Sequence, residues 1–545
     1  MFRAREIAGI ATTGTVGHNV GIGGSMKSHE AIIIALMLGA APTAAQQPGE
    51  ATGTVSNYAA MSDAELKAEV DRLGDGWLGQ CEVSEPLLAE FSTRPAGEGY
   101  RAGMLLARAV CADKQGAYRQ AADAFAEYER DFDPSSFVGL GLYLDSRLDD
   151  AASALARLER FANTATDETA GALDVAGFQT AARLARKHGR EDAFEDLSFR
   201  LFQSPLYASF SGDVKSGIAY RALKPAIRAN NDALIDETLG QIRNPVSYPD
   251  LLALREYESA WPKIERRVGE HFTAITENYR HWAAARYDNA SYDRERFSDA
   301  AQALYFDGRF EEATALARKW RERPGAFGNI QEGDAWALNI EAYALDALGR
   351  IDEADAVFDR LAELPADENP WVVNFVINRS SRLVGQTRFV EGLEAARLAR
   401  EVAEVHGSTY ARMLVARDHA CALHGLDRGE EAETELAYLR ENRVETVAVA
   451  AQALLCAGRR DEALAMLIDG LEEERTRSNV IGGLLPEEYD LFYTASILPQ
   501  PRDLLATSAE LRMAYQRWAR EIPEEFEPAA SRKRVPLDRT PRSAR

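Results

Sequence analysis

Apolar residues recur at helical spacing in several segments of this chain, and the segments resemble one another. Two of the stripes consist of Ala121, Ala124, Phe125 and Tyr128, and of Ala354, Val357, Phe358 and Leu361. In both, the apolar positions are i, i+3, i+4 and i+7, which lie along one side of an α-helix. Alternation of apolar and polar residues, typical of half-buried strands, is scarce. The pattern therefore predicts an all-α fold.

A glycine precedes each of four such stripes by five residues, and alanines keep a constant distance from it. The glycines are Gly116, Gly308, Gly349 and Gly458; the alanines five residues later are Ala121, Ala313, Ala354 and Ala463; those seven residues earlier are Ala109, Ala301, Ala342 and Ala451. Glycine adopts the left-handed conformation without steric cost, so each one is expected to end a helix and turn the chain into the next. Because a lone helical hairpin cannot bury both apolar faces, the copies are expected to stack.

The motifs resemble those of the tetratricopeptide repeat family. That family carries Ala-x3-Phe in its second helix and a proline at the exit. The equivalent residues are Ala121, Phe125 and Pro134 in one copy and Ala354, Phe358 and Pro365 in another. The resemblance implies a right-handed superhelical solenoid of antiparallel helix pairs, which we expect over residues 58–477.

The turn glycines are unevenly spaced. They lie 41 residues apart from Gly308 to Gly349 but 109 apart from Gly349 to Gly458. We therefore expect degenerate copies in the gaps. The same distances, counted from Ser146 and from Asp427 in place of a turn glycine, fit two such copies. Weaker helical pairs surround Gly189 and Asn231.

The two ends of the chain differ from the repeats in composition. Residues 26–45 join a short positive segment to an apolar run and small residues, as in a secretory signal peptide; a buried helix is the alternative. Translation starting at Met26 would make residues 1–25 a mis-assigned leader, and starting at Met1 would make them a disordered one. Residues 46–57 are predicted to be a flexible linker, 478–529 a C-terminal helical cap, and 530–545 a basic disordered tail.

The formal net charge of −23 limits the partners. An acidic surface repels nucleic acid and anionic membranes and suits a basic partner, although solubility alone also explains such a charge. After signal cleavage no segment long enough for stable membrane insertion would remain. The mature chain is therefore expected to be soluble and periplasmic.

Four cysteines form two sequence-local pairs. The periplasm is oxidising and permits disulfides. A bond between Cys81 and Cys111 would staple the exposed end of the repeats, and Cys421 and Cys456 could pair within them. Buried free thiols are the alternative in both cases.

The aromatic region 257–306 is the candidate binding surface. In a superhelix the first helix of each pair lines the concave groove, where Tyr, Trp and Arg make good anchors. Tyr279, Arg280, Trp282 and Arg286 are therefore predicted to belong to a binding surface. Ordinary burial in the core is the alternative for these aromatic residues.

Motifs for catalysis are missing. There is no nucleophile elbow, no zinc-binding His-Glu-x-x-His and no phosphate loop. Glu277 and His281 have the spacing of a base-orienting pair but no nucleophile signature accompanies them. Cys421 and His424 could share a metal but fall in a helix of packing residues. No catalytic residue, cofactor or metal site is predicted.

These observations predict an exported, non-catalytic scaffold or adaptor that binds a protein or peptide partner in its superhelical groove. One alternative is a glycan- or peptidoglycan-associated helical module of an envelope or export machine, with the ligand engaging the aromatic residues. The other is an all-helical toroidal enzyme, which would need carboxylates or histidines converging in one cleft.

Overall fold

The computed structural model describes residues 57–73, 80–288, 294–492 and 496–537. In these ranges the structure is all-helical, with one isolated bridge between Leu254 and Ala519 and no strand, so the predicted all-α class is confirmed. The same ranges hold no helix long and apolar enough to cross a bilayer. The predicted leader (1–25), signal peptide (26–45) and, except for Asn57, linker (46–57) lie outside the described residues.

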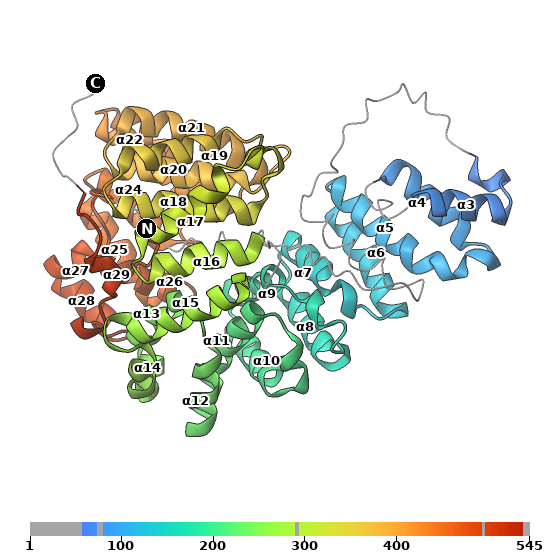
Figure 1. Cartoon of the computed structure of the whole chain (residues 1–545), viewed down its shortest axis with the longest axis horizontal. Helices are drawn as coiled ribbons and strands as arrows, with labels where there is room; N and C mark the ends of the chain where they lie inside the picture. The colour runs from blue at the N-terminus through green and yellow to red at the C-terminus, as the bar shows by residue number, and fades with distance from the viewer. Residues whose placement is uncertain (1–56, 74–79, 289–293, 493–495, 538–545) are drawn as a thin grey trace. The chain divides into compact units, whose positions relative to one another are not determined.

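The helices form two compact units, whereas a single array had been expected (Figure 1). We call residues 57–218 the N-terminal unit and residues 219–537 the C-terminal unit. The boundary falls within α11 (Gly212–Arg228). The α-helices of the N-terminal unit are α3 (Asp63–Leu73), α4 (Cys81–Ser92), α5 (Arg101–Lys114), α6 (Tyr118–Asp131), α7 (Val138–Arg147), α8 (Ala151–Thr164), α9 (Val175–Lys187) and α10 (Glu191–Gln203).

The C-terminal unit contains the larger set of helices after α11. They are α12 (Asp232–Gln241), α13 (Tyr248–Ala253), α14 (Trp261–Val268), α15 (Thr273–Asp288), α16 (Arg294–Phe306), α17 (Phe310–Arg321), α18 (Glu332–Ala347), α19 (Ile351–Ala362), α20 (Val372–Gly385), α21 (Phe389–His406), α22 (Thr409–Gly425), α23 (Glu433–Glu441), α24 (Val447–Cys456), α25 (Arg460–Glu472), α26 (Glu474–Leu484), α27 (Asp503–Thr507), α28 (Ala509–Gln516) and α29 (Ala529–Arg532).

Residues with positive φ mark the turns of the helical hairpins. The turn residues are Gly116, Asp149, Gly189, Asn230, Gly269, Gly308, Gly349, Thr387, Asp427 and Gly458. They recur at intervals of 31 to 41 residues. The 109-residue gap therefore holds two more hairpins, one at Asp427 as expected and one at Thr387 that the sequence did not indicate. The frame counted from Ser146 was displaced, since the turn residue is Asp149.

Eight of these ten turns, all except Asn230 and Gly269, are closed by the same backbone bond, and several also by an ion pair. The residue after the turn residue donates its N–H to the carbonyl five residues earlier, as in Arg350 N to Leu345 O at 2.8 Å. This bond is the Schellman closure of a helix end. The same arginine pairs with Glu353 in the first turn of the second helix, at 2.6 Å and 2.7 Å. Equivalent pairs join Arg309 to Glu312, Arg388 to Glu391 and Arg428 to Glu431.

Small residues allow the two helices of a hairpin to pack closely. The alanines at a constant distance from the four turn glycines are all 0% exposed, as are Phe125 and Phe358. These alanines are Ala109, Ala121, Ala301, Ala313, Ala342, Ala354, Ala451 and Ala463. First helices of neighbouring hairpins also pack on each other, α16 on α18, α20 on α22 and α22 on α24. Burial of these faces is the main source of stability.

The region after α26 leaves the hairpin pattern. Helix α28 packs on α25, the second helix of the hairpin that turns at Gly458. The chain then continues to α13, near the start of the C-terminal unit. There Arg520 N donates to Ala253 O at 2.8 Å, and Arg255 N donates to Trp518 O at 2.9 Å. The predicted cap (478–529) therefore also joins the two ends of the C-terminal unit (Figure 1).

The prediction of a disordered tail is wrong for residues 530–537. Ala530 is buried in α29, Lys533 Nζ donates to Asp307 O at 3.2 Å, and Val535 N donates to Ala347 O at 2.8 Å. The reason is that first helices end with carbonyl groups that lack intrahelical partners, and the tail supplies donors to them. Residues 538–545 lie outside the described part.

Candidate functional site

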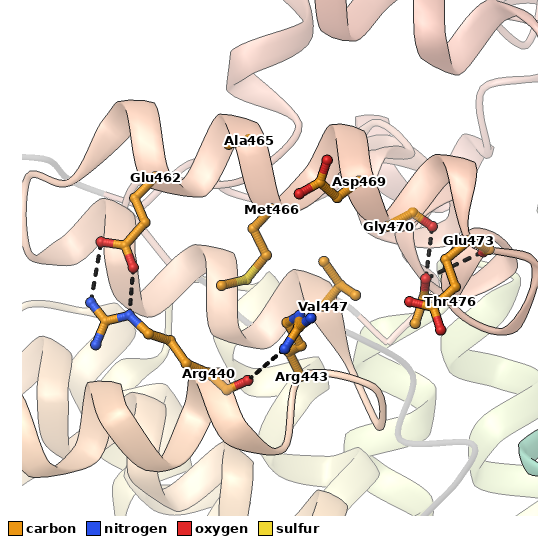
Figure 2. A pocket seen from close by; sticks show the side chains of 10 residues that line it. All are labelled: Arg440, Arg443, Val447, Glu462, Ala465, Met466, Asp469, Gly470, Glu473 and Thr476. Carbon is orange, nitrogen blue, oxygen red and sulfur yellow. Dashed lines mark hydrogen bonds and ion pairs between the residues drawn. The ribbon is translucent and has the colours of Figure 1, made fainter.

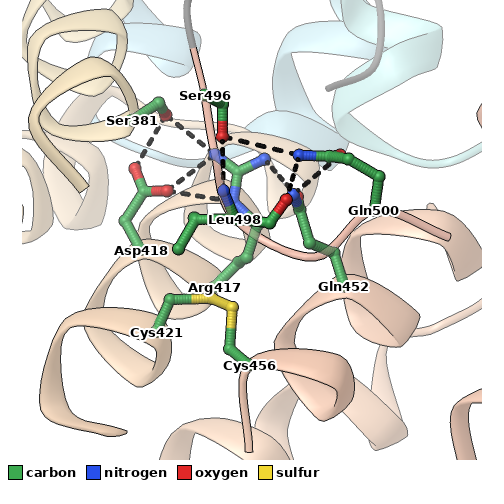
Figure 3. The surroundings of a disulfide bond; sticks show 9 residues. All are labelled: Ser381, Arg417, Asp418, Cys421, Gln452, Cys456, Ser496, Leu498 and Gln500. Carbon is green, nitrogen blue, oxygen red and sulfur yellow. Dashed lines mark hydrogen bonds and ion pairs between the residues drawn. A yellow bond between two sulfur atoms is a disulfide. The ribbon is translucent and has the colours of Figure 1, made fainter. Parts of the chain in front are cut away.

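A strip of polar side chains crosses the first helices of three successive hairpins. It consists of Ser381 on α20, Arg417 and Asp418 on α22, and Gln452 on α24, and we call it the polar strip (Figure 3). Each residue lies within ten positions before the turn of its hairpin, so the packing of α20 on α22 and of α22 on α24 brings them together. Arg417, Asp418 and Gln452 are 3%, 1% and 2% exposed.

Hydrogen bonds connect the strip from end to end. Ser381 Oγ donates to Asp418 Oδ2 at 2.7 Å. Arg417 donates from Nε and Nη2 to Asp418 Oδ1 at 2.9 Å and 2.7 Å, and from Nη1 to Gln452 Oε1 at 3.3 Å. The charge of the guanidinium is therefore balanced by the adjacent carboxylate. Buried charges require such partners.

A stretch of the chain without regular secondary structure, residues 496–500 with a bend at Leu498, lies on this strip (Figure 3). Gln452 Nε2 donates to Gln500 Oε1 at 2.9 Å, and Gln500 Nε2 donates to Leu498 O at 3.1 Å. The backbone N–H of Ile497 donates to Gly385 O at the end of α20, at 2.8 Å. The stretch is therefore held to the hairpins by one backbone bond and one side-chain amide bond.

A disulfide fixes the helices beneath this stretch. Cys421 is bonded to Cys456, and these residues follow Arg417 and Gln452 by four positions on α22 and α24. Residues four apart lie on the same side of a helix. The disulfide therefore holds together the two helix faces that carry the strip (Figure 3). The second pair that the sequence suggested, Cys81 and Cys111, is bonded between α4 and α5 in the N-terminal unit.

The predicted aromatic site lies on α15, the second helix of its hairpin, because the positive-φ residue Gly269 precedes it. Tyr279 is buried, with its ring stacked on Trp282 at 5.5 Å and near Phe306 at 6.1 Å. The guanidinium of Arg286 covers the Trp282 ring at 4.3 Å. The aromatic faces are therefore covered by neighbours within the chain.

The arginines of this predicted site are also engaged. Arg280 Nε lies 2.9 Å from Asp307 Oδ2, and Arg286 Nη1 donates to Asp299 Oδ2 at 2.8 Å. These ion pairs join α15 to α16 and to the turn that follows it. The four predicted residues do lie together, but their contacts connect two helices of the unit.

A surface cavity of about 310 Å³ lies between α25 and the stretch that joins α23 to α24 (Figure 2). The ion pair of Arg440 with Glu462 borders it at one side, and Met466 lies between this pair and Asp469. Arg443 donates to Arg440 O at 3.3 Å. The lining thus combines both signs of charge around a small apolar area.

Other buried charges stabilise contacts between hairpins. Arg382 of α20 donates to both oxygens of Asp346 of α18, at 2.6 Å and 2.7 Å. Burial raises the pKa of Asp346, while the Arg382 bonds oppose that rise. Burial also raises the pKa of Glu332 to about 8, although Trp336 Nε1 donates to its carboxylate at 3.1 Å. Both acids lie on α18, which packs on α16, α17 and α19.

Histidine and cysteine chemistry is limited in the described ranges. They contain no group of three or more His, Cys, Asp or Glu residues placed to hold a metal ion. Cys421 cannot act as a thiolate ligand with His424, because its sulfur is bonded to Cys456.

The polar strip was missed in the sequence because its residues look like ordinary helix residues. A signal existed nevertheless: Arg417 and Asp418 are adjacent charges within a helix that is otherwise rich in alanine and leucine, and both fall in the first helix of the Asp427 frame.

No protein-family model matches this chain, and no curated protein matches it.

Proposed function

We propose that this protein is an exported, non-catalytic scaffold with a tetratricopeptide-like solenoid of helix pairs, and that it binds a protein partner through an extended peptide. The recurrence of hairpins at 31 to 41 residues supports the solenoid. The two disulfides support export, because such bonds persist mainly in oxidising compartments.

One observation carries the binding proposal. The polar strip and the neighbouring Gly385 carbonyl already hold a non-helical stretch of chain, through the backbone N–H of Ile497 and the side-chain amide of Gln500. A surface that satisfies these groups in its own chain has the hydrogen-bonding pattern that a peptide of another protein needs. The acidic character of the chain, with a net charge of −23, favours a partner that is basic outside the bound peptide.

A protein partner is favoured over a glycan. Sugar recognition by stacking needs an open aromatic face, whereas Tyr279 is buried and the half-buried Trp282 ring is in contact with both Tyr279 and the Arg286 guanidinium. The predicted site on α15 therefore gives the glycan alternative little support.

The test is selection of peptides from a displayed library of linear sequences by the exported full chain. The comparison uses chains that carry Gln500→Ala, in which the chain's own segment makes no bond to the Gln452 amide. In these chains we expect selected peptides to bind Gln452→Met at least about tenfold more weakly than the chain with Gln452, since methionine keeps the side-chain volume and loses the amide. Gln516→Ala, which alters an exposed glutamine on α28, is the matched control and should bind like the wild type. Failure to select any peptide, with a folded chain confirmed by circular dichroism, would overturn the proposal.

A further inference from the structure

The carbonyl group two residues before a hairpin turn is occupied in the same way in two successive hairpins. At the Gly349 turn, Ala347 O accepts from the backbone N–H of Val535 at 2.8 Å. At the Thr387 turn, Gly385 O accepts from the backbone N–H of Ile497, also at 2.8 Å. The donors come from two separate stretches with different sequences. At these two turns the same position in the hairpin therefore accepts a backbone N–H from elsewhere in the unit.

The physical reason is the way in which a first helix ends. The last carbonyls of a helix have no intrahelical donor. At the Thr387 turn, Leu383 O accepts from Arg388 N and Val384 O accepts from Thr387 N. The closure leaves Gly385 O directed to a donor from outside the hairpin. An extended peptide provides such a donor at every second residue on one side.

Few hydrogen bonds hold residues 496–500 to the hairpins, although Gln500 itself is buried. Ile497 and Leu498 are half-buried, and Pro499 is exposed. Two bonds hold the segment to the hairpins: Ile497 N to Gly385 O, and Gln452 Nε2 to Gln500 Oε1. Exchange of such bonds for those of another peptide costs little, because each is worth only a small net free energy.

From these contacts we propose that residues 496–500 are an internal ligand that occludes the partner site, and that the partner peptide displaces them. This inference rests on the proposed function and adds its regulation. The displacing peptide is extended, donates a backbone N–H to Gly385 O, and places an uncharged hydrogen-bonding side chain against Gln452. An uncharged side chain fits because Asp418 already neutralises Arg417 beneath it.

The occlusion is tested with a labelled synthetic peptide of residues 496–505, Ser-Ile-Leu-Pro-Gln-Pro-Arg-Asp-Leu-Leu, added to the full chain. Ile497→Pro removes the N–H donor, and Gln500→Ala removes the amide partner of Gln452. We expect each variant to bind the labelled peptide about tenfold more tightly than the wild type, since the internal ligand competes less well. Pro499→Ala, at the exposed position, is the matched control and should behave like the wild type.

Two outcomes would overturn the occlusion. One is equal affinity of the labelled peptide for the wild type and both variants; the other is no binding to either variant while circular dichroism shows native helicity. If peptides selected from the library bind the wild type and both variants with equal affinity, the proposed function stands and the occlusion alone fails. If the library yields no ligand for the wild type or for either variant, the proposed function fails as well.

Discussion

The disulfide between Cys421 and Cys456 offers the sharpest test of how the C-terminal unit is stabilised. It closes a loop of about 35 residues, the sequence separation of the two cysteines. In the chain-entropy description, closing such a loop removes about 13 cal/mol/K from the unfolded chain, or about 3.8 kcal/mol at 25 °C. The double variant Cys421→Ala/Cys456→Ala should therefore lower the free energy of unfolding of this unit by up to about 4 kcal/mol.

Tryptophan fluorescence during urea unfolding is the appropriate assay, because six of the seven tryptophans belong to the C-terminal unit. With an m-value of about 3 kcal/mol/M, the expected loss corresponds to a midpoint about 1.3 M lower. The matched control is Cys81→Ala/Cys111→Ala, which removes the other disulfide, with a sequence separation of 30, from the N-terminal unit. An unchanged midpoint for the first variant, or equal shifts for both variants, would refute the reasoning.

Two further predictions concern single residues of the C-terminal unit, with the same urea assay. The pKa of Glu332 is raised from 4.5 to about 8, so its stabilisation is complete below about pH 4.5 and is lost as the pH rises through 8. The free energy of unfolding of the wild type should fall by about 2 kcal/mol between pH 5 and 8.5, a value reduced for the partial exposure of the side chain. The free energy of unfolding of Glu332→Gln should not fall in this way. Equal losses in the two proteins would contradict the assignment. Thr387 has a φ of 59°, so Thr387→Gly should raise the free energy of unfolding by about 1 kcal/mol. Gly349 has a φ of 73°, so Gly349→Ala should lower it by about 1 kcal/mol. A destabilised Thr387→Gly would show that its hydroxyl bond to Gln386 O outweighs the backbone strain.

The hairpins were predictable where local chemistry and packing agree. Gly349 and Gly458 take the left-handed conformation for which glycine is favoured, and the alanines around them are fully buried. The hairpin at Thr387 was not predictable, because a β-branched residue resists that conformation and its choice is imposed by the packing of α20 against α21. Local propensity is a weak guide wherever tertiary packing opposes it.

The candidate site was predictable only in part. Tyr279 and Trp282 do come together, as their helical spacing indicates. The spacing did not reveal that α15 is a second helix, since this depends on the turn at Gly269. The polar strip escaped notice because Arg417 and Gln452 are 35 residues apart in sequence and meet only through the packing of α22 on α24.

The sequence by itself determined the helical hairpin, because periodic apolar residues and a turn glycine act over distances of only a few residues. The sequence also suggested a disulfide between Cys81 and Cys111, and these residues are bonded in the structure. The tertiary structure alone decided the division at residue 218 and the course of the chain after α26. There the contacts join residues such as Arg520 and Ala253, and no local pattern encodes a bond between atoms that only the completed fold brings together.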